Sequence, residues 1–475
     1  MAKENNTAKD YLLDSDRNIF LTGKAGTGKT YQIARFVEEM NKRHKQVMVC
    51  APTGAAAVNA CGETAHSLFG IPIPCYGVSI SKVQPVKIKT LALADAVVID
   101  EISMMRNDNF SFAMWVLKKA EKIKGKKIRV ILVGDFSQLP PVVTKKDLPF
   151  LKKFGYDPSG YAFTTKEWAA LKLKTVELTE IYRQKEDKEL AEKLGQVQVN
   201  DLSCMGYFQQ FVREGYTAKE DEIQICGTNA EADEINRSYL DRINSPMIAY
   251  QAVKKGRTGA GICDDIILLK KGARVMFQIN DVKAGKYRNG TTGTIENLNE
   301  KCVAVRLDSG ETIPVFPHEY KVYSYRVVGG NLSRNEIGSI TQMPIKVAKA
   351  ITIHKSQGKT FEKAVITPTV FAPGQLYVAL SRITSPAGLV LTKELRPEYF
   401  RKNEIVDKFI ENGYTYDIPA AKKQPAAKKP AAKSKSGTKT AAGKKKTTSK
   451  TAARKNTKTA AVKKTKTTGS RGARK

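Results

Sequence analysis

The chain has 475 residues, of which 41% are hydrophobic and 27% charged. This length allows two to four domains with buried cores. No apolar run approaches the roughly 18 residues that a membrane span needs, and the first residues lack the apolar stretch of a secretory signal. We therefore expect no membrane association and a location in the cytoplasm or nucleoid, with a bacterial or viral source favoured, or in the nucleus if the source is eukaryotic. Seven cysteines form no CxxC pair, which argues against a zinc module or a disulfide framework.

The net charge of +33 is unevenly distributed along the chain. Residues 418–475 hold 20 Lys and Arg and no Asp or Glu, which leaves 60 basic against 47 acidic residues in the rest. A polyanionic partner is therefore expected for both parts. The Lys/Ala-rich segment 413–475 has too few large apolar residues to offset its ordering entropy, so we predict a disordered tail. Nucleic-acid binding through counterion release is its favoured role, and a solvated solubility tail is the alternative.

The first third of the chain predicts a parallel α/β sheet. Near-continuous apolar runs end in polar or Gly-rich residues, as strands buried on both faces do, at 19–22, 46–52, 92–101 and 127–135. The segment 29–42 predicts an intervening helix. Ligands bind at the carboxyl ends of such strands, so the polar residues there are the candidates for chemistry.

A second set of similar runs predicts a second α/β domain. These runs lie at 175–180, 222–229, 363–369 and 388–394. Between them, residues 255–345 are rich in Gly, Val and turn pairs and predict a small inserted β-barrel. The expected organisation is a first domain over 1–175, a second over 176–254 and 346–412, the insertion, and the tail.

The strongest motif is a phosphate-binding loop between a predicted strand and a predicted helix. It fits GxxxxGK[ST] and comprises Gly23, Lys24, Ala25, Gly26, Thr27, Gly28, Lys29 and Thr30. Backbone N–H groups of such a loop surround phosphates, the lysine reaches the β- and γ-phosphates, and the Thr30 hydroxyl binds Mg²⁺. A chance Gly-rich turn is the alternative, which the flanking elements disfavour. ATP and Mg²⁺ are the expected cofactors.

Further candidates for the chemistry follow other predicted strands. Asp100 and Glu101 end an apolar strand, where Asp100 suits a Mg²⁺ ion and Glu101 suits orientation or deprotonation of the attacking water. Gln138, in the segment 134–141, suits sensing of the γ-phosphate, although a tight turn would use similar residues. Arg183 and Arg382 suit stabilisation of transferred phosphoryl charge, against the alternative of ordinary surface arginines.

The segment 353–360 groups phosphate-binding donors around a glycine turn. His354, Lys355, Ser356 and Thr360 are candidates for binding phosphate oxygens, as is Gly358. A structural histidine is the alternative for His354.

Together these segments resemble superfamily 1 helicases, and most closely the petite-integration-frequency family, a sister of the RecD-like and phage Dda-like helicases. The matching segments occur in family order over residues 17–395. They are GKAGTGKT (23–30), APTGAAAVNACGETAHSLF (51–69), VIDEISM (98–104), VGDFSQLPPV (133–142), LTEIYRQ (178–184), ITIHKSQGKTFEKAVI (351–366) and QLYVALSR (375–382). The family's Gln upstream of the phosphate loop is absent from this chain, which leaves Asn5, Asn6 or backbone contacts to read adenine.

The resemblance implies two RecA-like domains with ATP between them, a short wedge insertion in the first and an SH3-like insertion in the second. It implies DNA lying across both domains and translocation in the 5′-to-3′ direction. Arg183 and Arg382 would be arginine fingers, and Gln138 and Gln357 would link nucleotide state to DNA grip. It also implies that His354, Lys355, Ser356 and Thr360 contact DNA and that Gly358 contacts the nucleotide. Thr53, His66 and Phe69 would join the DNA contacts, with Phe69, Pro72 and Pro74 as a candidate wedge. For Phe69, a core aromatic is an equally good interpretation.

The expected function is an ATP-dependent DNA helicase acting on single-stranded and forked DNA, as a monomer, in replication, repair or recombination. A single-strand-stimulated translocase that remodels protein–DNA complexes without efficient unwinding is the alternative. A non-catalytic DNA-packaging protein is a third hypothesis, which the intact phosphate loop disfavours. The residues alone do not distinguish RNA from DNA as the substrate.

Overall fold

The computed structural model describes residues 11–13, 16–72, 75, 84–258, 262–279, 281, 286–287, 290–328 and 331–417. All of these fall within the first of two units, residues 1–421. The basic tail from residue 418, Asn5, Asn6 and Pro74 lie outside the described residues, so the expectations for them stay predictions. None of the described helices has the length and apolar character of a membrane span.

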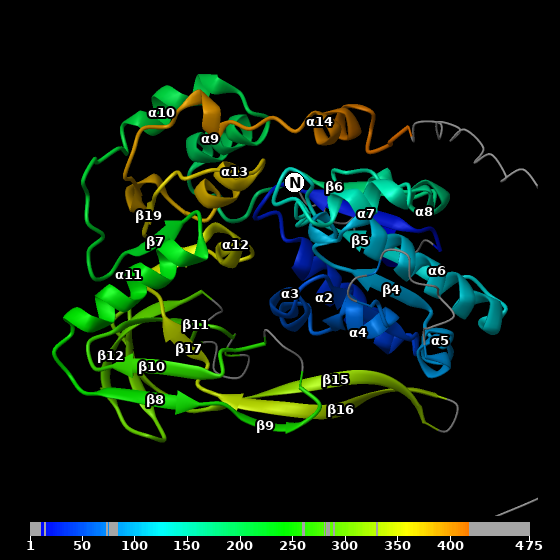
Figure 1. Ribbon diagram of the computed structural model, residues 1–475, viewed down its shortest axis with the longest axis horizontal. Helices are drawn as coiled ribbons and strands as arrows, with labels where there is room; N and C mark the ends of the chain where they lie inside the picture. The colour runs from blue at the N-terminus through cyan, green and yellow to red at the C-terminus, as the bar shows by residue number, and fades with distance from the viewer. Residues whose placement is uncertain are drawn as a thin grey trace, which may run out of the picture. The chain divides into compact units, whose positions relative to one another are not determined.

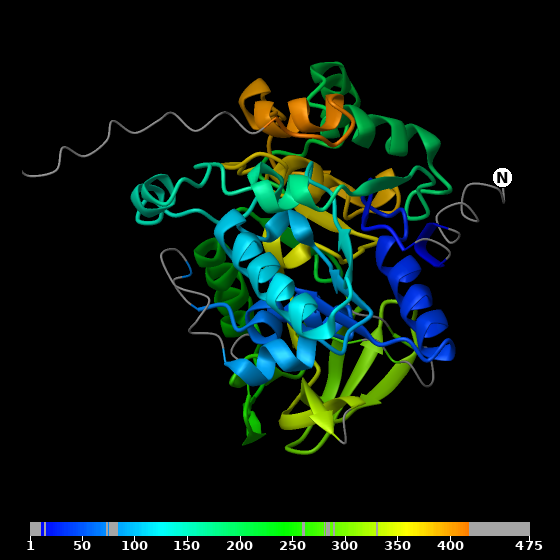
Figure 2. The ribbon, with the colours of Figure 1, turned by 90° about the vertical axis from the view of Figure 1, so that its right-hand side faces the viewer.

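The first lobe is built on a six-stranded parallel sheet (Figure 1). Its strands, in spatial order, are β3 (Glu63–Thr64), β2 (Val47–Ala51), β4 (Ala96–Ile99), β5 (Arg129–Val133), β1 (Ile19–Gly23) and β6 (Lys174–Leu178). Helix α2 (Lys29–Lys42) buries Ile33 and Phe36 against one face, and α6 (Asn107–Lys124) covers the other (Figure 2). Both faces are thus apolar, as the continuous hydrophobic runs predicted.

One strand joins a different sheet from the one expected. The run predicted over 175–180 was assigned to the second domain, but β6 pairs in parallel with β1 along its whole length, from Ile19 opposite Lys174 to Gly23 opposite Leu178. An apolar run predicts a buried strand, but its residues do not specify the neighbour. The first sheet therefore ends at Leu178.

The second lobe carries a four-stranded parallel sheet. Its strands, in order, are β18 (Ala350–Thr352), β7 (Ile223–Cys226), β19 (Ala364–Ile366) and β20 (Leu389–Leu391). The sequence predicted the last three, whereas the short β18 had no separate signal. The sheet packs with helices α9 (Lys188–Gln198), α10 (Met205–Gln209), α11 (Asn229–Arg242), α12 (Ile353–Ser356) and α13 (Gln375–Leu380).

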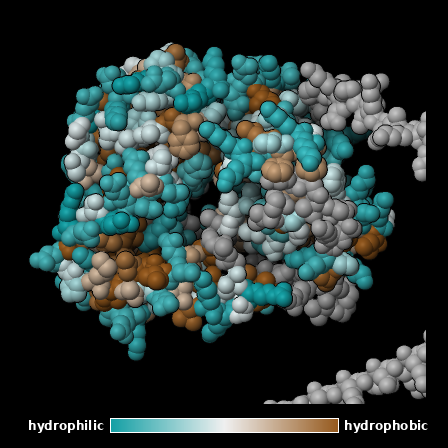
Figure 3. Space-filling model, viewed as in Figure 1, coloured by the Kyte–Doolittle hydropathy of each residue, from teal (hydrophilic) through white to brown (hydrophobic). Residues whose placement is uncertain are grey.

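An all-β insertion separates α11 from β18. It contains an antiparallel five-stranded sheet in the order β14 (Thr312–Val315), β13 (Val303–Leu307), β12 (Thr292–Leu298), β11 (Arg274–Phe277) and β17 (Ile345–Val347). Two smaller sheets flank it, formed by β8 (Met247–Gln251) with β10 (Ile266–Lys270), and by β9 (Val253–Gly256) with β16 (Asn331–Gln342) and β15 (His318–Val328). The insertion begins with β8, earlier than the predicted residue 255, and apolar side chains gather on its surface (Figure 3).

The long hairpin of the insertion reaches the first lobe. Strand β15 contacts helices α4 (Ala65–Phe69) and α5 (Pro85–Leu91).

The end of the described chain returns to the first lobe. Helix α14 (Glu404–Glu411) buries Val406 and Phe409 in the same core cluster as Phe20 of β1, and Tyr414 and Tyr416 pack against that cluster. Residues up to 412 were predicted to belong to the second domain and the tail to begin at 413, whereas α14, Tyr414 and Tyr416 pack on the first-lobe cluster. The low-complexity composition begins only after these aromatic residues.

Candidate functional site

The phosphate-binding loop joins β1 to α2 in a conformation that its glycines permit. Gly26 and Gly28 both have φ of 83°, in the left-handed region, and Gly28 precedes the first residue of α2. The Lys29 amino group donates to the carbonyl oxygens of Gly23 at 2.7 Å and Lys24 at 3.0 Å. Burial lowers the pKa of Lys29. The Lys29 ammonium therefore bonds to carbonyl oxygens of its own loop, and phosphate oxygens of a bound nucleotide would take their place as acceptors.

The other loop residues are held mainly by local or second-lobe contacts. The Thr27 hydroxyl donates to the Lys24 carbonyl at 2.9 Å, and Ala25 is buried among second-lobe residues. The Thr30 side chain is exposed and lines the main cavity of the described residues.

Two carboxylates follow β4 beside this loop. Asp100 is buried, and its Oδ1 accepts the backbone N–H of Glu101 at 2.8 Å. Glu101 has φ of 51°, a left-handed conformation that is strained for a residue with a side chain. Burial, with a further contribution from Asp100, raises the pKa of Glu101 to about 7. A carboxyl group with this pKa is suited to accepting a proton from water near neutral pH.

Gln138 lies at the boundary between the lobes. Its side-chain amide donates to Asp135 Oδ2 at 3.0 Å. Its backbone carbonyl oxygen faces Gly374, which precedes α13. A Cβ atom added to Gly374 would lie 2.2 Å from that oxygen. The two backbones are therefore in direct contact, and glycine is what permits it.

Helix α13 also holds the phosphate loop through a tyrosine. The Ala25 N–H donates to the Tyr377 hydroxyl at 2.9 Å, and Tyr377 is fully buried. Tyr377 was not among the predicted site residues. The only available signal was its position in the apolar helix five residues before Arg382.

The guanidinium groups of both predicted arginines bond to residues of the second lobe. The Arg183 guanidinium donates to the Thr360 hydroxyl at 2.9 Å and to the Ser381 carbonyl at 3.1 Å. Arg382 is 1% exposed and donates to the Val378 carbonyl at 2.8 Å. Burial lowers the pKa of Arg382, and the positive charge of Arg183 lowers it further. The carboxylates of Glu101 and Asp135 act in the opposite direction and raise the pKa of Arg382.

The segment 353–360 divides its side chains between the core and the cavity. Gln357 donates to Glu101 Oε2 at 3.1 Å, a direct bond between the lobes. His354, Lys355, Gly358 and Thr360 line the cavity. Ser356, by contrast, is fully buried and its hydroxyl donates to the Ile353 carbonyl at 2.7 Å, so it does not face the cavity.

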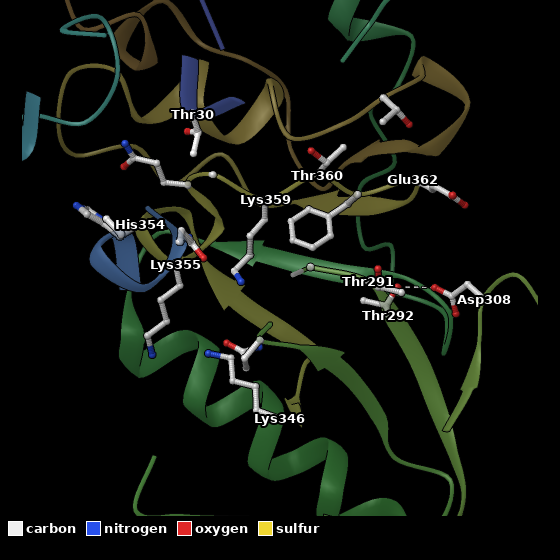
Figure 4. A pocket seen from close by; sticks show the side chains of 18 of the residues that line it. Thr30, Thr291, Thr292, Asp308, Lys346, His354, Lys355, Lys359, Thr360 and Glu362 are labelled. Atoms are coloured by element: carbon white, nitrogen blue, oxygen red, sulfur yellow. Dashed lines mark hydrogen bonds between the residues drawn. The ribbon is translucent and has the colours of Figure 1, made fainter. Parts of the chain in front are cut away.

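A cavity of about 1050 Å³ is lined by some of these groups, but Lys29, Gln138 and the two arginines are not among its lining residues. It extends from Thr30, Asp100 and Glu101 past the segment 353–360 to the five-stranded sheet of the insertion (Figure 4). Lys346 of β17 and Lys359 enter it from different elements. Burial and the neighbouring Lys346 charge lower the pKa of Lys359 to about 7. When both are protonated, these two neighbouring ammonium groups attract an anion, and neither was among the predicted site residues.

The remaining predicted DNA contacts are not brought together. Thr53 lines the cavity. His66 and Phe69 lie on α4, away from it, and Phe69 is completely buried in the first-lobe core. The core-aromatic interpretation therefore describes Phe69 in this structure.

A phosphate loop on one parallel-sheet lobe, facing two arginines held by a second such lobe, defines a two-lobed P-loop nucleoside triphosphatase. Residues 5–215 match the model of the PIF1-like helicase family. The ATP-dependent DNA helicase Pif1 of Campylobacter jejuni is 30% identical over 419 residues, which cover 81% of this chain and 91% of that protein. The chain therefore belongs to the PIF1-like helicase family, as its motifs predicted.

Solved structures agree over most of the chain. A crystal structure of Bacteroides sp Pif1 in complex with ADP-AlF4 is 32% identical, covers 87% of this chain and 97% of its own, and has a TM-score of 0.76. Bacteroides Pif1 bound to ssDNA is also 32% identical, covers 86% and 96%, and has a TM-score of 0.62.

Proposed function

We propose that this protein is an ATP-driven DNA helicase that moves 5′-to-3′ along single-stranded DNA and unwinds forked duplexes. Its family makes it an ATP-hydrolysing DNA helicase. One observation supports the coupling of hydrolysis to movement: Glu101 beside the phosphate loop is hydrogen-bonded at 3.1 Å to Gln357, in the segment that carries the candidate DNA contacts. A change at the nucleotide therefore acts directly on that segment.

Hydrolysis is assigned to groups from both lobes. Lys29 would leave the Gly23 and Lys24 carbonyls to bind the β- and γ-phosphates, and Glu101 would take the proton of the attacking water. Arg183 and Arg382 would stabilise the charge that spreads over the phosphoryl oxygens. Gln138, tied to Asp135 and touching Gly374, is suited to report the γ-phosphate to the second lobe.

A Mg²⁺ ion fits the donors beside the loop. Thr30 and Asp100 line the same cavity and supply a hydroxyl and a carboxylate oxygen, the ligands that hard cations prefer. Asp100 is further oriented by the Glu101 N–H. The bound ion would neutralise phosphate charge.

Single-stranded DNA is the proposed occupant of the basic part of the cavity. His354, Lys355 and Thr360 line it, with Thr53 from the first lobe. Phosphate contacts of this kind bind without reading sequence. The basic tail from residue 418 would add salt-dependent affinity. We propose that the antiparallel sheets between α11 and β18 form the SH3-like insertion and that the two parallel sheets form the RecA-like domains. The protein is proposed to act as a monomer where the DNA is, in the nucleoid or the nucleus.

Unwinding of duplexes with a single 5′ or 3′ overhang tests this function. We expect ATP-dependent strand separation from the 5′ overhang and little from the 3′ overhang. Unwinding only from the 3′ overhang would contradict the proposed direction. Single-strand-stimulated ATP turnover with no strand separation on a fork would favour a translocase that remodels protein–DNA complexes, and no turnover at all would contradict both.

A further inference from the structure

The polypeptide crosses from the second lobe to the first immediately before α14. Phe400 is buried in the second-lobe cluster, whereas Val406, six residues later, is buried in the first-lobe cluster. Six residues span at most about 20 Å when fully extended. The Asn403 side chain donates to the Tyr161 hydroxyl at 2.5 Å, which anchors the crossing on the first lobe. We call residues 403–416 the strap.

The strap is anchored by aromatic rings. Phe409 stacks on Phe163, with ring centroids 4.0 Å apart and planes 6° apart. It also meets the edge of Phe136 at 5.5 Å, and Tyr414 meets Phe20 at 5.6 Å. Phe409 is completely buried. A cluster packed this tightly has discrete arrangements, so moving one ring moves its neighbours.

The cluster reaches the nucleotide site through one short loop. Phe136 lies two residues before Gln138, and between them the Ser137 N–H donates to Asp135 Oδ1 at 3.0 Å. A small cavity is lined by Phe136, Gln138, Gly374, Tyr377, Val406 and Asp407. The strap and Gly374 of the second lobe therefore line the same small cavity beside this loop.

We propose that Phe409 and Val406 are positioning residues for Gln138, and that the strap thereby sets how strongly single-stranded DNA stimulates ATP hydrolysis. Phe136 is clamped by Phe409, and the loop that carries Phe136 also carries the glutamine that contacts α13. Loosening the clamp lets Gln138 move while Lys29, Arg183 and Arg382 are left unchanged. The inference deepens the proposed function and rests on it.

The test uses the full-length chain and the ratio of ATP turnover with saturating oligo(dT) to turnover without DNA. This ratio does not depend on the fraction of folded enzyme. We expect Phe409→Leu and Val406→Ala to lower it at least about fivefold, while Lys408→Ala, on the exposed face of α14, keeps it. Thermal unfolding followed by circular dichroism checks that each variant folds.

A double-mutant cycle separates positioning from general loosening. If the strap acts through Gln138, then Phe409→Leu combined with Gln138→Ala has the same ratio as Gln138→Ala alone. Independent losses that multiply in the double variant, or unchanged ratios in the single variants, overturn the inference. If Phe409→Leu does not fold, Val406→Ala decides in the same cycle. A wild-type chain that DNA fails to stimulate would overturn the proposed function itself, which distinguishes the two failures.

Discussion

Gly374 is a position where the backbones of the two lobes are in direct contact. It has φ of 76° and begins the helix that carries Tyr377 toward the phosphate loop. In Gly374→Ala, the new Cβ would lie 2.2 Å from the Gln138 carbonyl oxygen and 2.8 Å from that of Ser137. Both neighbours are backbone atoms, so no flexible side chain can yield. The substitution must push the loop and the helix apart.

The size of the effect follows from two contributions. A left-handed backbone costs an alanine roughly 1–2 kcal/mol relative to glycine. A Cβ and a carbonyl oxygen need a separation of about 3.4 Å, so the two segments must separate by about 1 Å. A displacement of this size in catalytic groups can reduce turnover about 100-fold. We therefore expect a modest loss of thermal stability and a loss of DNA-stimulated kcat near that magnitude.

A matched glycine isolates the second contribution. Gly310, in the turn between β13 and β14, has φ of 94°, and nothing lies within 4 Å of its added Cβ. Gly310→Ala should therefore show the strain alone, with kcat close to wild type. The assay is steady-state ATP turnover with saturating oligo(dT), with melting curves for both variants. If Gly374→Ala keeps kcat within about threefold of Gly310→Ala, the direct lobe contact does not control turnover.

The other predictions concern the loop, the base, the lobe contact and the tail. Lys29→Ala should lower ATP turnover at least about 100-fold, because it removes the ammonium expected to bind the β- and γ-phosphates, and unchanged turnover would show that the nucleotide site is elsewhere. The pKa of Glu101 is raised to about 7, so its carboxylate form is lost below that pH. Because the base must be ionised, kcat/KM for ATP should fall about tenfold per pH unit below pH 7 in a stopped ATPase assay. A flat profile from pH 5 to 7 would exclude Glu101 as the base. Tyr377→Phe leaves the Ala25 N–H without its acceptor, so it should destabilise the protein by about 1–3 kcal/mol in chemical denaturation, whereas no change would show that this bond contributes nothing. Deleting residues 418–475 should weaken single-strand binding and flatten its salt dependence in fluorescence titrations while DNA-independent ATP turnover stays near normal, and a large loss of that turnover would contradict a role limited to binding.

Local sequence patterns predicted the parts of the site that are contiguous in the chain. The loop at Gly23–Thr30 needs a strand, glycines and a helix in immediate succession, and Asp100 needs only to follow an apolar strand, so their surroundings are encoded next to them. The same holds for the helix that ends before Arg382. Phe69 was ambiguous for the opposite reason, since a large aromatic ring suits a core and a DNA platform equally, and only packing against the first sheet distinguishes them.

Contacts between distant segments required the fold. The amino acids of β6 suit a strand in either sheet, and only the fold shows that it pairs with β1 as the edge strand of the first sheet. The bonds from Tyr377 to Ala25 and from Gln357 to Glu101 join residues more than 250 positions apart, which no local pattern relates. The packing of Phe409 in the first-lobe aromatic cluster also required the fold, because an amphipathic pattern predicts a buried helix face but not the surface that buries it. The sequence by itself thus determined the family and indicated the chemistry, while the tertiary structure decided which groups of the two lobes touch.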